Sequence, residues 1–97
     1  MNVNGHYTKI GDNKGKYYNI NIPFNTGFGL MSDDVSPLGD AEYVFICKNF
    51  LLPIIKEFDP ELIFISAGFD SAKGDPLGNL SLYPSVYYYM TTELMKI

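Results

Sequence analysis

The sequence predicts an α/β fold built on a parallel sheet, of which these 97 residues form only a segment. The first observation is the order of elements, which is strand, long loop, helix, strand, loop, helix; a helix that joins two strands predicts a right-handed parallel crossover. The second is the strand at 61–66, whose apolar run is typical of a central strand covered by helices on both faces. The third is that two strands and two helices are too few to cover it, which leaves sheet edges exposed.

Composition narrows the class of protein. Hydrophobic residues make up 46% of the chain and charged residues 19%, as in folded globular proteins. The net charge is -4 with only 7 Lys and Arg, so we expect no direct binding to nucleic acid. The single cysteine, Cys47, and the single histidine, His6, exclude an internal disulfide, a cysteine-based zinc site and a two-histidine metal site.

No apolar run approaches the roughly 20 residues that a membrane span needs. The first residues also lack the apolar stretch of a secretory signal. We therefore expect no membrane association and a reducing, intracellular compartment.

The first part of the chain predicts a loop followed by a strand. Residues 1–16 are polar and rich in Gly and Asn, which indicates a loop leader before an α/β segment at 17–97. Residues 17–22 alternate, with Tyr18, Ile20 and Ile22 on one face, so we expect a half-buried strand that Pro23 ends. A long loop should follow at 24–39.

Residues 40–58 predict a helix with Asp40 as its N-cap and a kink or break at Pro53. Cys47 lies on the apolar stripe of this helix, where a buried hydrophobic residue is favoured over a reactive thiol. The stripe follows helical spacing and consists of Tyr43, Ile46, Cys47, Phe50, Ile54 and Phe58.

After the strand at 61–66, a loop at 67–83 leads to a last helix. Pro84 suits its first position, and Val86, Met90, Leu94 and Ile97 give it an apolar stripe that runs to the end of the chain. The run 87–89 has three tyrosines, which fan around a helix, so one or two should be core and the rest surface. His6, in the polar leader, should be solvated.

The loop that leaves the apolar strand holds the best candidate for chemistry. Ligands of open α/β sheets bind at the carboxyl ends of strands, and Asp70 would lie just above this one. Asp70 could be a metal or catalytic carboxylate, but aspartates in Gly/Pro loops also commonly serve turns. Asp75, inside Gly-Asp-Pro, is interpreted as a turn residue.

Three blocks of sequence resemble the zinc-dependent histone deacetylases, and most closely their class II branch. They are GKYYNINIPF at 15–24, GDAEY at 39–43 and LPIIKEFDPELIFISAGFDSAKGDPLG at 52–78, in the order of the family. The resemblance runs from about Gly11 to the last residue and corresponds to a central-to-C-terminal segment of the catalytic domain. The same superfamily includes the acetylpolyamine amidohydrolases.

The resemblance implies the three-layer arginase/deacetylase fold, present here as a partial segment. It implies that Asp70 is one of three protein ligands to zinc, which in the family activates water and polarises the acetamide carbonyl of acetyl-lysine. Leu77 matches a position that lines the substrate tunnel. Tyr18 matches a position whose backbone carbonyl helps to bind a structural potassium ion.

The resemblance also shows which parts are missing. The family's other two zinc ligands, in an Asp-x-His motif, and its pair of proton-handling histidines lie upstream of this segment; its oxyanion tyrosine, in Gly-Gly-Tyr, lies downstream. We therefore assign no catalytic residue within the segment. Since catalytic zinc usually has three protein ligands, the chain alone should bind zinc weakly and lack deacetylase activity.

Three details depart from the family pattern. Asn79 stands where a second Gly usually follows Gly78, although Asn tolerates the left-handed conformation better than most residues do. Tyr83 replaces the usual Thr before Pro84, so the cap of the last helix should be lost or moved. The loop at 28–37 looks longer than usual.

Two other functions stay open. One is a non-catalytic interaction module or pseudo-enzyme that keeps the core of the fold. The other is an amidohydrolase of acetylated polyamines or other small amides. The deacetylase interpretation implies acetylated protein substrates such as histone tails, a nuclear or cytoplasmic location, and partners in a co-repressor complex or self-association through exposed sheet edges.

Overall fold

The computed structural model of the chain describes residues 5–24 and 38–97. Most of the predicted loop at 24–39, and all of its lengthened part at 28–37, lies outside these ranges. Helices are the regular elements of the described residues, and they are η1 (Asn13–Gly15), a 3₁₀ turn; α1 (Asp40–Ile46); η2 (Cys47–Leu51), a π-helical turn; α2 (Leu52–Phe58); and α3 (Pro84–Leu94).

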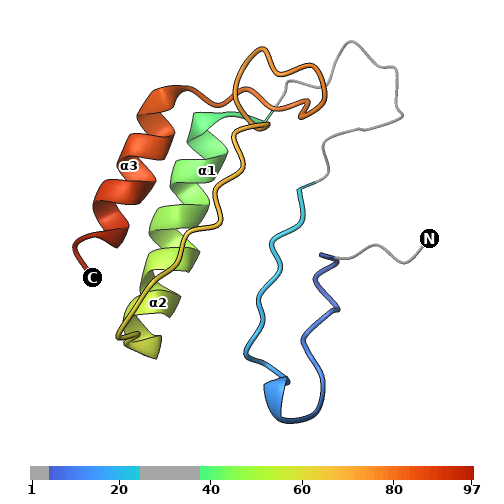
Figure 1. The fold of residues 1–97 in the computed structure, drawn as a ribbon, viewed down its shortest axis with the longest axis vertical. Coiled ribbons are helices and arrows are strands. Elements are labelled where there is room, and N and C mark those ends of the chain that lie inside the picture. Colours follow the sequence, from blue (N-terminus) through green and yellow to red (C-terminus); the bar gives the residue numbers. More distant parts are fainter. Residues whose placement is uncertain (1–4, 25–37) are drawn as a thin grey trace.

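The predicted helix at 40–58 is present and continuous, because α1, η2 and α2 follow one another without a gap (Figure 1). Pro53 lacks an N–H, and its ring would crowd the carbonyl of Asn49 in a regular α-helix. The helix meets this constraint with the π turn η2, where the Leu52 N–H donates to the carbonyl of Cys47. The interruption predicted at Pro53 is thus a local widening of the helix, which continues to Phe58 and ends at Asp59 in the left-handed conformation.

The predicted N-cap of this helix is wrong by one residue. Gly39 is the N-cap, and its backbone N–H donates to Glu42 Oε2 at 2.9 Å, a bond that also lowers the pKa of Glu42. Asp40 is the first residue of α1, and its carboxylate is directed to a different helix. It accepts the Tyr83 N–H at 2.8 Å and the Ser85 hydroxyl at 3.2 Å, at the start of α3.

The cap of α3 has therefore moved, as the Tyr83-Pro84 sequence predicted. Tyr83 is the N-cap residue of α3 and makes no side-chain cap bond, and Asp40 supplies the acceptor from across the chain. Pro84 is the first residue of α3, as predicted. The helix ends at Leu94, a turn earlier than the sequence pattern indicated. Of the three tyrosines at 87–89, Tyr88 is exposed and the other two are half-buried.

The strand predicted at 17–22 is absent from the described residues, although its alternation is confirmed. Asn19 and Asn21 point to one side, where their amides donate to the backbone carbonyls of His6 and Lys9. Ile20 and Ile22 line the other side, against the long helix. Tyr17, at φ 71°, belongs to a turn, and the extended part begins at Asn19; it pairs with no strand among the described residues. A strand needs a ladder partner as well as the right pattern of side chains.

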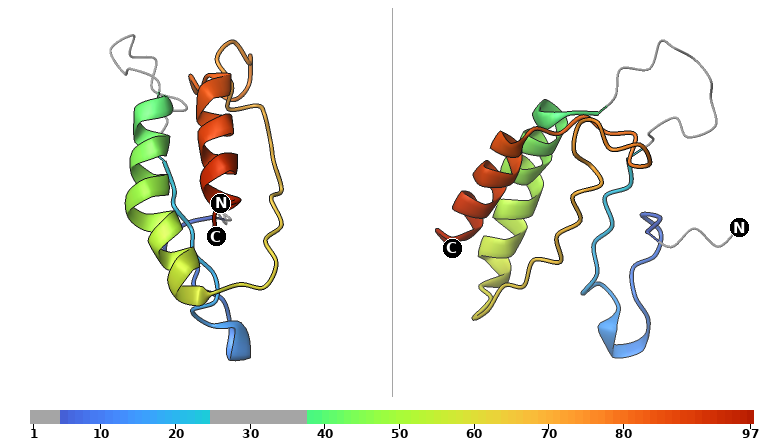
Figure 2. Two further views of the ribbon diagram at one scale, coloured as in Figure 1. Left: turned by 90° about the vertical axis from the view of Figure 1, so that its left-hand side faces the viewer. Right: turned by 45° about the horizontal axis from the view of Figure 1, so that its top comes forward.

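The strand predicted at 61–66 is likewise an extended segment without a ladder, so the predicted central position in a sheet is not realised within the described residues. Phe64 is 88% exposed, and Leu62 and Ile65 are also exposed. Figures 1 and 2 show that this segment and the one at 17–24 run in the same direction along the helices. An apolar run without neighbours cannot bury both faces, which is why these side chains remain in contact with solvent.

Two isolated parallel bridges join three distant parts of the chain. Gly39 pairs with Ser81, and Ala72 pairs with Leu82, so the short segment before α3 lies between the start of α1 and the loop after residue 70. Leu82 is 1% exposed and Val86 is also buried, where α3 packs beside α1 (Figures 1 and 2). Cys47 belongs to the same set of buried residues, as predicted, and burial raises the pKa of its thiol.

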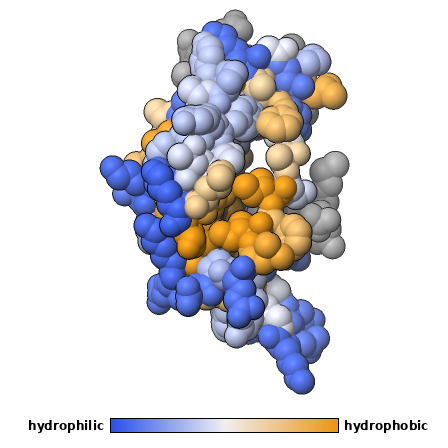
Figure 3. Space-filling model, turned by 60° about the vertical axis from the view of Figure 1, so that its left-hand side comes forward, coloured by the Kyte–Doolittle hydropathy of each residue, from blue (hydrophilic) through white to orange (hydrophobic). Residues whose placement is uncertain are grey.

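Much apolar surface is left uncovered. Figure 3 shows hydrophobic side chains gathered on one face of the molecule. Phe50, Ile54 and Phe58, which the stripe of the long helix predicted to be core, are exposed. A patch of this kind marks a surface that another part of a protein or another protein covers. Among residues 5–24 and 38–97, no helix is both long enough and apolar enough to cross a membrane.

Candidate functional site

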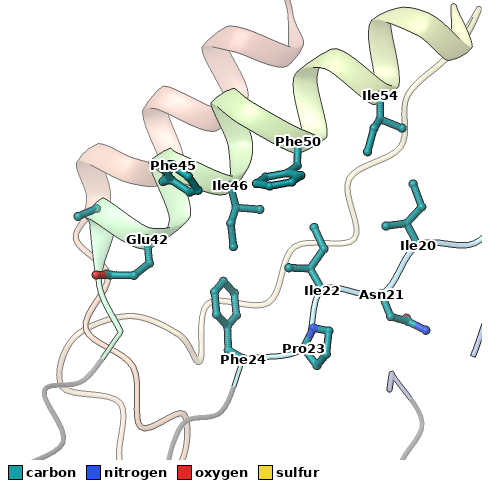
Figure 4. A pocket seen from close by; sticks show the side chains of 11 residues that line it. Ile20, Asn21, Ile22, Pro23, Phe24, Glu42, Phe45, Ile46, Phe50 and Ile54 are labelled. Atoms are coloured by element: carbon teal, nitrogen blue, oxygen red, sulfur yellow. The ribbon is translucent and has the colours of Figure 1, made fainter. Parts of the chain in front are cut away.

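One cavity among the described residues is apolar and offers little chemistry. It has a volume of about 720 Å³ and lies between the extended segment at 20–24 and the long helix, where Ile22 and Phe24 face Ile46 and Phe50 (Figure 4). Its two polar side chains are engaged elsewhere, because Glu42 accepts from Gly39 and Asn21 donates to the 6–9 turn. It is an unfilled packing space with no group placed for catalysis.

A second cavity, of about 490 Å³, contains Asp70. It is formed where the extended segment passes into its loop and meets α1 and α3. Asp70 is an exposed residue and is the only carboxylate among the described residues that line this cavity. The full lining is Tyr43, Ile65, Ser66, Ala67, Gly68, Phe69, Asp70, Ser71, Gly78, Leu80, Tyr87, Met90, Thr91 and Leu94.

The backbone at Asp70 is fixed by close contact with Gly78. A Cβ built on Gly78 would lie 1.5 Å from the Asp70 carbonyl oxygen, so no side chain fits there without a shift of the backbone. Asp75 shapes the turn between them as predicted, since its Oδ1 accepts the N–H groups of Leu77 at 2.8 Å and of Gly78 at 2.9 Å. Asn79 then adopts φ 49°, the left-handed conformation that was expected of it.

The residues on either side of Asp70 are attached to α3. The Ser71 hydroxyl and the Tyr87 hydroxyl lie 2.7 Å apart in a partly buried hydrogen bond. The Phe69 ring meets the Tyr87 ring edge to face, with centroids 5.3 Å apart. Tyr87 thus holds both neighbours of Asp70 and fixes the loop on the helix.

A second phenol, that of Tyr43, lines the same cavity as Asp70. The pKa of Tyr43 is raised above its ordinary value of 10.0, mainly because the phenol is partly buried and also because Tyr87 and Asp70 add negative charge nearby. The cavity thus combines a carboxylate with two phenols, whose hydroxyl groups are hydrogen-bond donors.

The raised pKa of Tyr43 predicts a loss of stability at high pH. The unfolded chain gives up the phenolic proton first, so the free energy of unfolding should fall as the pH rises above 10.0. Tyr43→Phe should remove part of this loss. Tyr88→Phe, at an exposed position, is the matched control and should leave the slope unchanged. Urea unfolding at several pH values measures both slopes, and equal slopes for the two variants would contradict the assignment.

Leu77 and Tyr18 do not line the cavity that holds Asp70. Leu77 is 80% exposed at the tip of the same loop, one residue from Gly78. Tyr18 is exposed in the first extended segment, where it lines a separate space of about 440 Å³ with Phe58 and Leu62. The structure therefore brings Leu77 near Asp70 through the loop and leaves Tyr18 in another part of the molecule.

The donor set for a metal is incomplete in the part of the chain that the structure describes. No group of three or more His, Cys, Asp or Glu side chains lies close enough together to hold an ion. Catalytic zinc takes three protein ligands, and this cavity supplies one carboxylate. These residues alone therefore do not fit a catalytic zinc site, in agreement with the absence of an Asp-x-His motif from the sequence.

Sequence reasoning missed three residues of this cavity. Tyr43, Ser71 and Tyr87 line the cavity with Asp70, whereas the sequence alone places them in a helix stripe, a loop and a run of tyrosines. For Tyr43 and Tyr87, the available signal was a polar hydroxyl on an otherwise apolar helix face. Which loop those hydroxyls face is decided by contacts between residues distant in sequence.

Comparisons with known proteins agree on one family. A family profile described as "Histone deacetylase domain" matches residues 3–97. Histone deacetylase 18 of Arabidopsis thaliana is 38% identical over 92 residues, which make up 95% of this chain and 12% of that protein. Polyamine deacetylase HDAC10 of Danio rerio is 40% identical over 91 residues, or 94% of this chain and 12% of that protein. The chain thus spans about an eighth of the length of these relatives.

Solved structures give the same result. The crystal structure of the HDA15 HD domain matches with a TM-score of 0.81 at 35% identity, over 96% of this chain and 24% of that one. The structure of the histone deacetylase Clr3 matches with a TM-score of 0.81 at 32% identity, over 96% of this chain and 14% of that one. The helices and extended segments of this chain therefore have the same arrangement as a part of a larger chain in each of these two structures.

Proposed function

Because the chain belongs to the histone deacetylase family, we propose that it forms a segment of a zinc-dependent deacetylase and contributes one zinc ligand, Asp70, to the site. The reaction is hydrolysis of an acetyl-lysine amide to lysine and acetate. The observation that carries the proposal is the match over residues 3–97 to a domain whose known examples are several times longer. The uncovered apolar surface of the segment supports it, since the rest of such a domain would cover that surface.

The position of Asp70 supports its role as a ligand. It is exposed at the end of an extended segment, where α/β domains place their sites, and its backbone is held by Gly78. A carboxylate that is exposed to a cavity and fixed at its Cα can accept a metal without reorganisation. Zinc in the complete domain would polarise the amide carbonyl and activate water.

Two further roles follow from the same proposal. Leu77, exposed beside the Asp70 loop, would form part of the wall of the substrate tunnel. The backbone carbonyl of Tyr18 would help to bind a potassium ion, for which the described residues provide no other predicted ligand. Both roles require the remainder of the domain.

The isolated chain should not deacetylate. An acetyl-lysine peptide incubated with the purified 97 residues should show no conversion by mass spectrometry, with or without added zinc, because one carboxylate does not complete the ligand set. The longest product of the gene, tested beside it, should convert the peptide and lose that activity with a chelator. Conversion by the isolated chain, or a full product that is inactive, would refute the proposal.

A small amide is the second candidate substrate, because one of the relatives at about 40% identity is named a polyamine deacetylase. The longest gene product can be assayed with an acetyl-lysine peptide and with a mono-acetylated polyamine at equal concentrations. A higher kcat/KM for the peptide supports the protein substrate, and a higher value for the polyamine replaces it. Activity on neither would favour the interaction module or pseudo-enzyme.

The partners and location follow from the substrate. A deacetylase of histone tails would act in the nucleus, and one of other acetylated proteins in the nucleus or the cytoplasm. Association in a co-repressor complex, or between copies through the uncovered extended segments, is compatible with the exposed apolar side chains. The acidic chain with only 7 Lys and Arg argues against direct binding to nucleic acid.

A further inference from the structure

The carboxylate of Asp40 forms hydrogen bonds with residues that are far from it in sequence. Asp40 Oδ1 accepts the backbone N–H of Tyr83 at 2.8 Å, and Asp40 Oδ2 accepts the hydroxyl of Ser85 at 3.2 Å. Both donors belong to the beginning of α3. The carboxylate accepts the N–H of the N-cap residue of a helix to which it does not belong, the role that the N3 side chain has in a capping box.

The charge of Asp40 suits this position. The N-terminus of a helix carries a partial positive charge and unpaired N–H groups, and α3 has no acidic residue in its own first turn. Tyr83, the residue at the N-cap position, makes no cap bond with its side chain. Asp40 therefore provides both the acceptor and the negative charge that this helix lacks.

The segment that Asp40 holds is joined in turn to the Asp70 loop. The Leu82 N–H donates to the Ser71 carbonyl at 3.2 Å, and the Lys73 N–H donates to the Leu82 carbonyl at 2.8 Å. Leu82, between these bonds and Tyr83, is 1% exposed and cannot move without disturbing the core. A short path of hydrogen bonds thus runs from Asp40 through Tyr83 and Leu82 to Ser71, the residue after Asp70.

We propose that Asp40 is a positioning residue that sets the Asp70 loop against α1 and α3. Its two hydrogen bonds hold residues 83–85, and the adjoining Leu82 holds residues 71–73 through its backbone. The effect of Asp40 on a metal bound at Asp70 rests on the function proposed above. Its effect on the order of the loop is independent of that function.

Amide hydrogen exchange in the 97-residue chain tests the path of hydrogen bonds directly. Asp40→Ala should speed exchange of the Tyr83, Leu82 and Lys73 amides by about fivefold to tenfold, the effect of losing a cap. Asp40→Asn, which keeps an acceptor oxygen, should restore most of the protection. Ser85→Ala removes one bond and should have a smaller effect of the same kind on a chain that remains folded.

Glu42→Ala is the matched control. It removes a carboxylate from the same first turn of α1 and a bond to Gly39, but no contact with Tyr83 or Ser85. It should affect the Leu82 and Lys73 amides much less than Asp40→Ala does, since its bond reaches this segment only through the bridge from Gly39 to Ser81. Equal effects of Asp40→Ala and Glu42→Ala, or an effect of Asp40→Ala that stops at Tyr83, would overturn the proposal.

Mn²⁺ serves as a separate probe of Asp70, since carboxylates bind it readily. In the unsubstituted chain it should broaden the amide signals of residues 68–72, and about threefold more Mn²⁺ should be needed in Asp40→Ala. Equal titrations would overturn the consequence for the metal ligand. If Mn²⁺ broadens no signal in the unsubstituted chain, the consequence for a metal fails in this segment, and the exchange rates still decide the role of Asp40.

Discussion

Replacing Gly78 with alanine should lower the free energy of unfolding by about 3 kcal/mol, at the upper end of the range for overpacking. The added Cβ would lie 1.5 Å from the Asp70 carbonyl oxygen and 2.6 Å from its carbonyl carbon. Both atoms belong to the backbone, so no rotation of a side chain relieves the clash. The chain must move either Gly78, which disturbs the turn that Asp75 holds, or Asp70, which displaces the loop that carries it.

Gly15→Ala is the control for this variant. Nothing lies within 4 Å of a Cβ built on Gly15, and alanine there should change stability by less than about 0.5 kcal/mol. Urea unfolding followed by circular dichroism measures both variants. The amide signals of Asp70 and Ser71 should shift in Gly78→Ala and stay in place in Gly15→Ala. A Gly78→Ala chain as stable as the unsubstituted one would show that the Asp70 loop does not have the described geometry.

Leu82→Ala should cost about 2 to 5 kcal/mol of unfolding free energy, the range for truncating a buried leucine. Leu82 is 1% exposed and lies where the loop, α1 and α3 meet. The buried set of this segment is small, with Cys47, Leu52 and Val86 as its other members, so the remaining contacts cannot compensate. Since small domains are stable by only about 5 to 15 kcal/mol, this loss is a large fraction of the total stability of the chain.

Leu77→Ala makes the matched comparison, because it is the same substitution in the same loop at a side chain that is 80% exposed. It should change stability by less than about 0.5 kcal/mol. The thermal midpoints of the two variants, measured by circular dichroism under one set of conditions, give the comparison. Similar midpoints would mean that Leu82 is not a core residue.

The alternation of residues 17–22 could be predicted from the sequence, but the strand could not. Asn19 and Asn21 face the 6–9 turn and Ile20 and Ile22 face the long helix, as a period of two requires. The pattern states which side chains share a face. It does not state whether a second strand is present to accept the backbone hydrogen bonds, and the described residues contain none.

The apolar run at 62–65 shows the same limit. Its composition predicts burial on two faces, and yet Phe64 is 88% exposed. The side chains have the character of a central strand, and the elements that would cover them are not among the described residues. The comparison with the HDA15 HD domain, of which this chain spans 24%, gives the physical reason. The run has the apolar sequence of a central strand in the larger domain, but the neighbouring elements that would bury it are not among the described residues.

The site could be predicted in part, because its residues come from a local motif and its supports do not. The turn role of Asp75 and the left-handed conformation of Asn79 follow from local rules of loop chemistry and are confirmed. The contacts of Asp40 with Tyr83 and of Ser71 with Tyr87 join residues that are far apart in sequence. No local pattern encodes such contacts, which explains why Asp40 was assigned to the wrong helix.

The central claim is that Asp70 is a zinc ligand in a deacetylase, and zinc content measured on the longest gene product tests it most directly. Asp70→Asn keeps the size of the side chain and removes the charge, while Asp75→Asn does the same at a carboxylate assigned to a turn. We predict that the unsubstituted protein and Asp75→Asn each hold one zinc ion and release acetate from an acetyl-lysine peptide. Asp70→Asn should lose the zinc and at least about 100-fold of the activity, since even indirect supports of a metal ligand have effects approaching that size. An Asp70→Asn protein that retains both its zinc and its activity, or an unsubstituted product without zinc, would contradict this assignment.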